Sequence, residues 1–150
     1  MIWKLNTESR LHAWQNFRHS LDDMDIQTAL KETENFWQSA PHMPYYLEHE
    51  STERWPDPWE LITENYYCDV AKCLGMLYTI YLSSHNDVET EIRVYRDKNS
   101  LFLYSVLWID EGKYILNWSE GEVVNTKLLE EKEPVLLHRY TSKDLQLEKY

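Results

Sequence analysis

Cys68 is the residue of this sequence that is best placed to act as a nucleophile. It stands at the predicted start of an apolar helix that continues to about residue 82. The dipole and the unsatisfied N–H groups of a helix N-terminus favour the thiolate form of a cysteine. A thiolate nucleophile also needs a general base and a group that orients the base. The rest of the chain must therefore supply these partners if Cys68 is catalytic.

The second cysteine, Cys73, does not extend this site. On one helix the two cysteines point about 140° apart, which suits neither a disulfide nor a shared metal. Two reduced thiols are typical of cytoplasmic proteins. The chain begins with no charged-then-apolar segment and has no run of 18 apolar residues. We therefore expect no signal peptide, no membrane contact and a cytoplasmic location.

The charge of the chain is strongly acidic. Fifteen basic residues face 26 acidic ones, giving a net charge of −11, and no basic stripe interrupts them. Direct binding to a phosphate backbone is therefore not expected. The acidity serves solubility, or it mimics nucleic acid and blocks a basic protein surface. The chain has only three glycines and no nucleotide, zinc or calcium motif, so we expect no cofactor and no metal.

Helices are predicted for the first half of the chain. An amphipathic helix covers residues 8–19, with Thr7 as its N-cap, and a second follows Asp25. Asp57, Pro58 and Glu60 form a capping box that starts a short helix over 58–64. The stretch from Cys68 to Leu82 is apolar almost all round, as in a central helix. The second helix presents one apolar stripe of Ile26, Leu30, Thr33 and Trp37.

The segment 40–58 is rich in proline and aromatic residues. Flexible linkers lack such side chains, so we expect an ordered connection and no domain boundary. The aromatic residues of this segment, together with Trp59, either fill the core or contact a partner protein. These interaction candidates are Tyr45, Tyr46, Trp55 and Trp59.

Strands are predicted for the second half. Residues 88–95 alternate between apolar and polar, which indicates a strand with one wet face. Residues 101–109 form an apolar, central strand, and shorter strands follow at 114–118, 122–125 and 135–140. The sequence thus predicts one α+β domain over residues 1–150. In it, N-terminal helices and a buried central helix pack on an antiparallel sheet of about four or five strands.

A cysteine that opens a buried helix and is followed by antiparallel strands resembles the transglutaminase-like form of the papain-like cysteine superfamily. The resemblance covers residues 55 to about 125, from Trp55–Trp59 through Cys68-Asp69-Val70-Ala71. It implies a histidine base on the second strand after the helix and an orienting acid near the end of the next. Carried over residue by residue, it makes Cys68 the nucleophile, Tyr104 the residue at the base position and Asn117 the residue at the orienting position.

This pattern departs from that of an active enzyme. No histidine occurs between residues 86 and 137, and a tyrosine with a pKa near 10 is a poor base. His138 on the last strand is the remaining candidate base. Asp69 is interpreted as a charge that favours the helix start, and Cys68 as the remnant of a nucleophile site or a core residue.

We therefore expect a non-catalytic protein-interaction or assembly protein on a degenerate scaffold. The chain also resembles bacteriophage proteins of unknown function. That likeness implies a partner among virion or assembly components, in the host cytoplasm or the virion. Two alternatives stay open. One is a cysteine hydrolase or acyltransferase with Cys68 as nucleophile, and the other is an acidic mimic of nucleic acid.

Overall fold

Five helices precede or flank the sheet in the computed structural model, which describes residues 1–44 and 47–150. The predicted interaction residues Tyr45 and Tyr46 lie outside the described residues. Four single 3-10 turns connect the regular elements. The helices are α1 (Thr7–Ser20), α2 (Ile26–Gln38), α3 (Pro58–Ile62), α4 (Asp69–Tyr81) and α5 (Thr126–Glu130).

Local capping explains where these helices begin. The Asp25 carboxylate accepts a hydrogen bond from the Thr28 N–H at 2.7 Å, as the sequence predicts. The capping box at Asp57 is also confirmed. The cap of α1 is Asn6, whose side chain accepts from the Ser9 N–H at 2.9 Å, and not Thr7. Both residue types cap well, and the asparagine stands one position closer to the start.

The sheet has five antiparallel strands in the order β4-β3-β2-β1-β5. The predicted α+β class is therefore confirmed, and β2 lies at the centre as expected. The β2–β3 ladder pairs Leu107 with Leu116 and ends there on that side. The strands are β1 (Thr90–Arg96), β2 (Leu103–Ile109), β3 (Tyr114–Ser119), β4 (Glu122–Val124) and β5 (Val135–Thr141).

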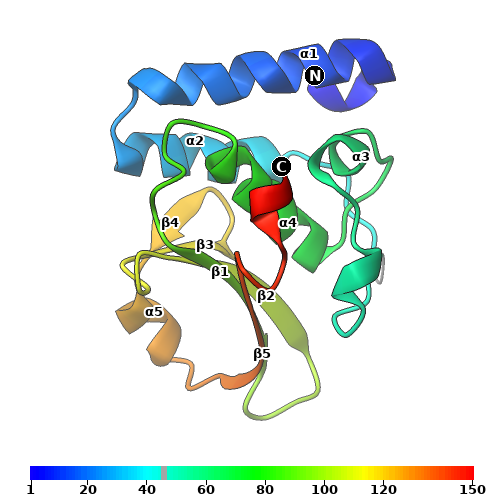
Figure 1. Ribbon diagram of the computed structural model, residues 1–150. Helices are drawn as coiled ribbons and strands as arrows, with labels where there is room; N and C mark the ends of the chain where they lie inside the picture. The colour runs from blue at the N-terminus through cyan, green and yellow to red at the C-terminus, as the bar shows by residue number, and fades with distance from the viewer. Residues whose placement is uncertain (45–46) are drawn as a thin grey trace.

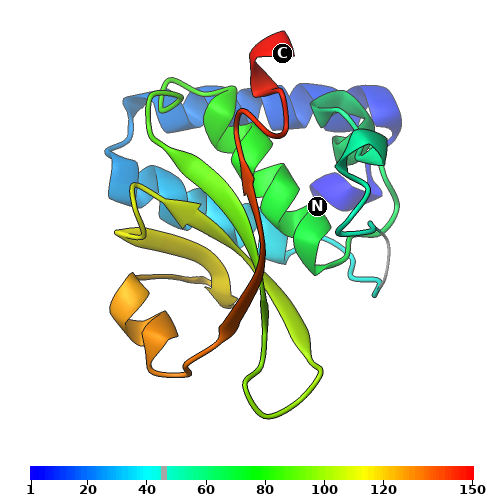
Figure 2. The same ribbon diagram turned by 60° about the horizontal axis from the view of Figure 1, so that its bottom comes forward.

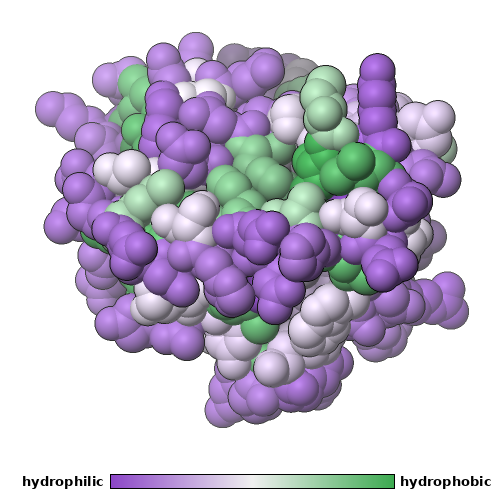
Figure 3. Space-filling view, turned by 90° about the horizontal axis from the view of Figure 1, so that it is seen from above, coloured by the Kyte–Doolittle hydropathy of each residue, from purple (hydrophilic) through white to green (hydrophobic). Residues whose placement is uncertain are grey.

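Helices α1, α2 and α4 lie on one side of the sheet, and α5 lies on the other (Figures 1 and 2). Helix α4 contacts β1, β2 and β3 and is buried along nearly its whole length. Gly75 lets α2 approach it closely, because a Cβ atom at that position would lie 2.5 Å from the Trp37 ring. Viewed from above, the molecule presents a mostly hydrophilic surface around a smaller apolar area (Figure 3).

The second face of the sheet is not wet, contrary to the expectation for residues 88–95. Tyr95 is 4 % exposed and belongs to a second apolar cluster with Val106, Ile115 and Leu129. Leu129 comes from α5, a helix that sequence periodicity did not predict. A five-residue helix is too short to show a period, yet it covers this face and buries side chains that the alternating pattern assigned to solvent.

Candidate active site

Cys68 is the N-cap residue of α4 and is 5 % exposed. Its sulfur accepts a hydrogen bond from the backbone N–H of Leu47 at 3.3 Å. Within residues 1–44 and 47–150 this is the one hydrogen bond recorded for the thiol. The chain at Leu47 therefore lies against Cys68. An N–H donor can stabilise sulfur charge, but it cannot remove the thiol proton.

Tyr104 points away from this cysteine. Its ring lies in the second apolar cluster, 5.2 Å from the Trp118 ring and 6.1 Å from the Tyr95 ring. Successive side chains on a strand point to opposite faces, so the neighbouring residue, Ser105, shares the face of Leu107 and α4. The predicted base position therefore does not meet Cys68. Burial also raises the pKa of Tyr104.

Ser105 faces α4, but no base among the described residues is hydrogen-bonded to its hydroxyl. It is 1 % exposed, and its hydroxyl has no hydrogen-bond partner among the described residues. Its backbone N–H donates to the Asp69 carboxylate at 2.6 Å, and its carbonyl accepts from the Asn117 side chain at 3.0 Å. These side chains continue the hydrogen bonding of β2 beyond the point where the β2–β3 ladder stops. Asp69 thus holds the sheet to the start of α4.

Asn117 is fully engaged by protein groups. It adopts a left-handed backbone conformation with φ of 66°, which asparagine tolerates better than most residues. Its side-chain nitrogen donates to Asp69 at 2.7 Å, and its side-chain oxygen accepts from Gln38 at 2.6 Å. Its backbone N–H donates to Glu34 at 2.7 Å. The resemblance places Asn117 at the position that orients the base. In this chain Asn117 instead binds the carboxylates of Asp69 and Glu34, and none of its recorded hydrogen bonds goes to an imidazole.

Two carboxylates anchor this network. Glu34 is fully buried and accepts from the N–H groups of Asn117 and Gly121, the latter at 3.0 Å. Burial raises the pKa of Glu34, and these two hydrogen bonds oppose the rise. Burial likewise raises the pKa of Asp69, opposed by its bonds from Ser105 and Asn117. Burial is the larger effect at both sites, because it disfavours the charged form.

Sequence reasoning missed Glu34 and Gln38, although a signal was present. Glu34 follows Leu30 by four positions and Gln38 follows it by eight, so both border the apolar stripe of α2. A polar residue on such a stripe is buried with a partner. The sequence does not identify that partner, because Asn117 lies 83 residues away from Glu34 along the chain.

His49 and His138 lie at the margin of the site. Their rings are 6.4 Å apart, and the His138 ring stacks on Tyr140 at 6.0 Å. Burial and the neighbouring His138 lower the pKa of His49, whereas Asp69 opposes this shift. No hydrogen bond recorded for the described residues joins either imidazole to Cys68. His138 therefore meets a second histidine rather than the thiol.

The tryptophans predicted for interaction differ in their settings. The Trp55 indole N–H donates to the Glu48 carbonyl at 2.8 Å, and its ring meets Tyr140 edge-on at 5.1 Å. Trp55 thus packs within the chain. Trp59 is 44 % exposed and meets the Tyr150 ring at 6.0 Å.

The described residues contain no cluster of three or more His, Cys, Asp or Glu side chains that could hold a metal ion. In the same residues, no helix has the length and apolar character needed to cross a membrane.

No protein-family model and no curated protein matches this chain. Solved structures of Legionella pneumophila LapG do match. The EGTA-treated form has a TM-score of 0.70 at 15 % identity, covering 91 % of this chain and 74 % of LapG. The calcium-bound form has a TM-score of 0.68 at 14 % identity, covering 93 % and 82 %. A third LapG structure gives 0.67 at 16 % identity, covering 91 % and 78 %. The chain therefore shares the fold of LapG over most of its length.

Proposed function

We propose that this chain is a non-catalytic protein-binding module on a transglutaminase-like scaffold. One observation supports the proposal most strongly. The side chain of Asn117, at the orienting position, forms hydrogen bonds with Asp69, Ser105 and Gln38. The hydrogen bond recorded for Cys68 comes from a backbone N–H that cannot act as a base. Such an arrangement stabilises a fold but does not generate a thiolate.

Thiol reactivity tests the non-catalytic half of the proposal. A thiol without a base stays mostly protonated near neutral pH. We expect iodoacetamide to alkylate folded Cys68 slowly at pH 6, faster at pH 8, and at the rate of an ordinary thiol once urea unfolds the chain. The Cys68→Ala variant reports the background from Cys73, which is fully buried with a pKa raised well above its usual range. Fast alkylation at pH 6 that urea abolishes contradicts the proposal.

The protein-binding half is supported by exposed apolar side chains at the connection between β1 and β2. Leu101 is 87 % exposed, Phe102 68 % and Leu103 41 %. Clustered exposed apolar side chains on a folded surface favour contact with another protein. We propose a protein partner, including a virion or assembly component, rather than nucleic acid. An acidic mimic would bind a basic partner with steep salt dependence, whereas an apolar contact loses little affinity in salt.

A second candidate function is cysteine hydrolysis or acyl transfer. The observation that favours it is the His49–His138 pair, because Leu47, which contacts Cys68, lies two residues before His49. A shift of this segment would bring an imidazole toward the thiol. The test is the pH profile of Cys68 alkylation in the His49→Ala and His138→Ala variants. If either histidine acts as the base, its alanine variant should show slower alkylation of Cys68 at pH 6. An unchanged alkylation rate would exclude that histidine as the base.

A further inference from the structure

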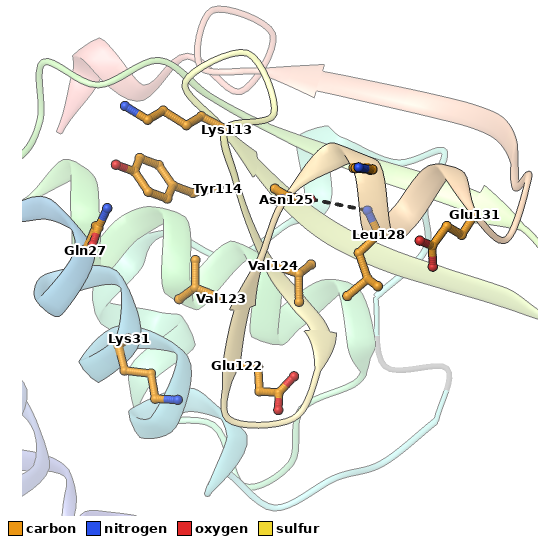
Figure 4. A pocket seen from close by; sticks show the side chains of 11 residues that line it. Gln27, Lys31, Lys113, Tyr114, Glu122, Val123, Val124, Asn125, Leu128 and Glu131 are labelled. Atoms are coloured by element: carbon orange, nitrogen blue, oxygen red, sulfur yellow. Dashed lines mark hydrogen bonds between the residues drawn. The ribbon is translucent and has the colours of Figure 1, made fainter.

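A groove of about 720 Å³ lies along β4, the last strand of the sheet on that side. Helix α2 forms one wall with Gln27 and Lys31, and α5 forms the other with Lys127 and Leu128 (Figure 4). Val123 and Val124 of β4 lie between the two walls. The groove is separate from the polar network at the start of α4, since none of its lining residues is Cys68, Asp69 or Asn117.

β4 offers an unpaired edge inside this groove. It pairs with β3 on one side, and no strand of the described residues pairs with its other side. An edge strand presents N–H and C=O groups that pair readily with another extended chain. Such edges attract unwanted partners unless they are covered or charged. Here helices stand on both sides of the edge, so an added strand would bury its side chains against them.

The charge of the groove differs from that of the whole chain. Lys31, Lys113 and Lys127 line it, although the chain carries a net charge of −11. Among the described residues, ion pairs join Arg93 and Arg139 to Glu91 and Lys98 to Glu133. None of the three groove lysines has a carboxylate within the distance of an ion pair. The Lys31 ammonium donates a hydrogen bond to the Gly121 carbonyl, but none of the three ammonium groups is paired with a carboxylate of the described residues, so each can pair with a carboxylate of a guest.

Apolar side chains provide the remaining contact area. Leu128 is 41 % exposed on the α5 wall, while Tyr114 at one end is 8 % exposed. The Lys113 ammonium lies 5.5 Å from the Tyr114 ring centre. Alternate side chains of an added strand point to opposite faces. An acidic side chain on either face of the added strand would then meet a lysine, Lys31 on the α2 wall or Lys127 on the α5 wall, and an apolar one on the α5 side would meet Leu128.

We propose that the β4 groove binds an extended, acidic segment of a partner protein as an added strand of the sheet. The backbone edge of β4 supplies hydrogen bonds, the lysines recognise carboxylates, and Leu128 with the valines packs against apolar side chains. Glu122 and Glu131 also line the groove and disfavour guest carboxylates at its margins. This inference rests on the proposed protein-binding function and names the chemical class of the partner.

The test is an NMR titration of the isotope-labelled full chain with three terminally blocked peptides. The first alternates glutamate with valine. The second has lysine in place of glutamate, and the third is the glutamate peptide with N-methylated backbone nitrogens. We expect the first alone to shift the amide signals of residues 122–124 and to slow the hydrogen exchange of β4. Equal binding of the lysine peptide overturns the charge assignment, and equal binding of the methylated peptide overturns strand addition.

Charge-reversed variants locate the binding. Lys31→Glu and Lys127→Glu test the two walls, and Lys4→Glu makes the same change on an exposed lysine outside the groove. We expect at least one wall variant to weaken the glutamate peptide roughly three- to tenfold, while the Lys4 variant binds as before. Shifts that avoid β4, or equal affinity in all three variants, overturn the inference. Neither outcome alters the alkylation of Cys68, so failure of the groove and failure of the non-catalytic proposal are distinguishable.

Discussion

The charged groups at the start of α4 have partners within the chain, whereas those of the β4 groove have no partner of opposite charge among the described residues. At the start of α4, the buried carboxylate of Glu34 and the partly buried carboxylate of Asp69 accept hydrogen bonds from within the chain on both of their oxygens. In the groove, Lys31, Lys113 and Lys127 face solvent without a carboxylate partner among the described residues. Satisfied groups contribute to stability, and unsatisfied exposed groups remain available for binding. The contacts at the start of α4 thus support the fold, and the binding surface that we propose lies elsewhere.

Removing a buried acceptor should produce the largest change. Glu34→Ala leaves the N–H groups of Asn117 and Gly121 without their partner. We expect the free energy of unfolding to fall by about 2–5 kcal/mol, since each unsatisfied buried group costs about 1–3 kcal/mol. Urea unfolding measures this. Glu32→Ala, on an exposed position of the same helix, is the control. A loss no larger than that of the control would mean that the network is not structural.

Asp69→Asn should have the next largest effect. Both carboxylate oxygens accept hydrogen bonds, one from Ser105 and one from Asn117. An amide offers one oxygen and must turn an NH₂ group toward the other donor. We expect a loss of about 1–3 kcal/mol in the free energy of unfolding, compared with Asp87→Asn at an exposed position. If Asp69 contributed only a favourable interaction with the helix dipole, the two variants would differ little in their free energy of unfolding.

The pH dependence of stability should reveal the buried carboxyl of Glu34. Its pKa is raised in the folded chain, so the folded state holds its proton more tightly than the unfolded state does. The stability that this provides is complete below the unfolded pKa and is lost as pH rises through the folded pKa. The gap in unfolding free energy between the natural chain and Glu34→Gln should therefore narrow from acid toward neutral pH. A gap that widens with pH would mean that the hydrogen bonds outweigh burial.

The binding surfaces should tolerate substitution with the smallest changes in stability. Phe102→Ser and Lys127→Glu alter exposed side chains, for which changes within about 0.5 kcal/mol are usual. Thermal unfolding of these variants beside Glu34→Ala would sharpen the contrast between the two regions. A large loss in Phe102→Ser would assign that side chain to the fold instead of to a partner.

Local signals in the sequence predicted most of the helices. Asp25 and the capping box at Asp57 act within one turn, so their effect can be read without the rest of the chain. The first strand was predicted from alternation and the central strand from its apolar run. Helix α5 was not predicted, and it covers the face that alternation assigned to water. Burial of a strand face depends on what packs there, which lies elsewhere in the sequence.

The site was predicted in outline but not in its contacts. Cys68 does begin the central helix, and Asn117 does lie near the end of the next strand. Tyr104 is one residue out of phase with the face that meets α4, because strand phase is set by the register with β1 and β3. The partners of Asn117 come from α2, α4 and β2, and no pattern within β3 indicates them.

The position of β5 has a consequence for how the chain is made. β5 pairs with β1, although residues 97–134 separate them, and Leu147 beyond it is buried in the main core. During synthesis, β1 to β4 leave the ribosome before β5, with the edge of β1 uncovered in the meantime. Such an edge invites pairing between nascent chains. The fold is therefore completed only after residues 135–147 have left the ribosome, and a chain cut before residue 135 would keep the β1 edge uncovered and be prone to aggregate.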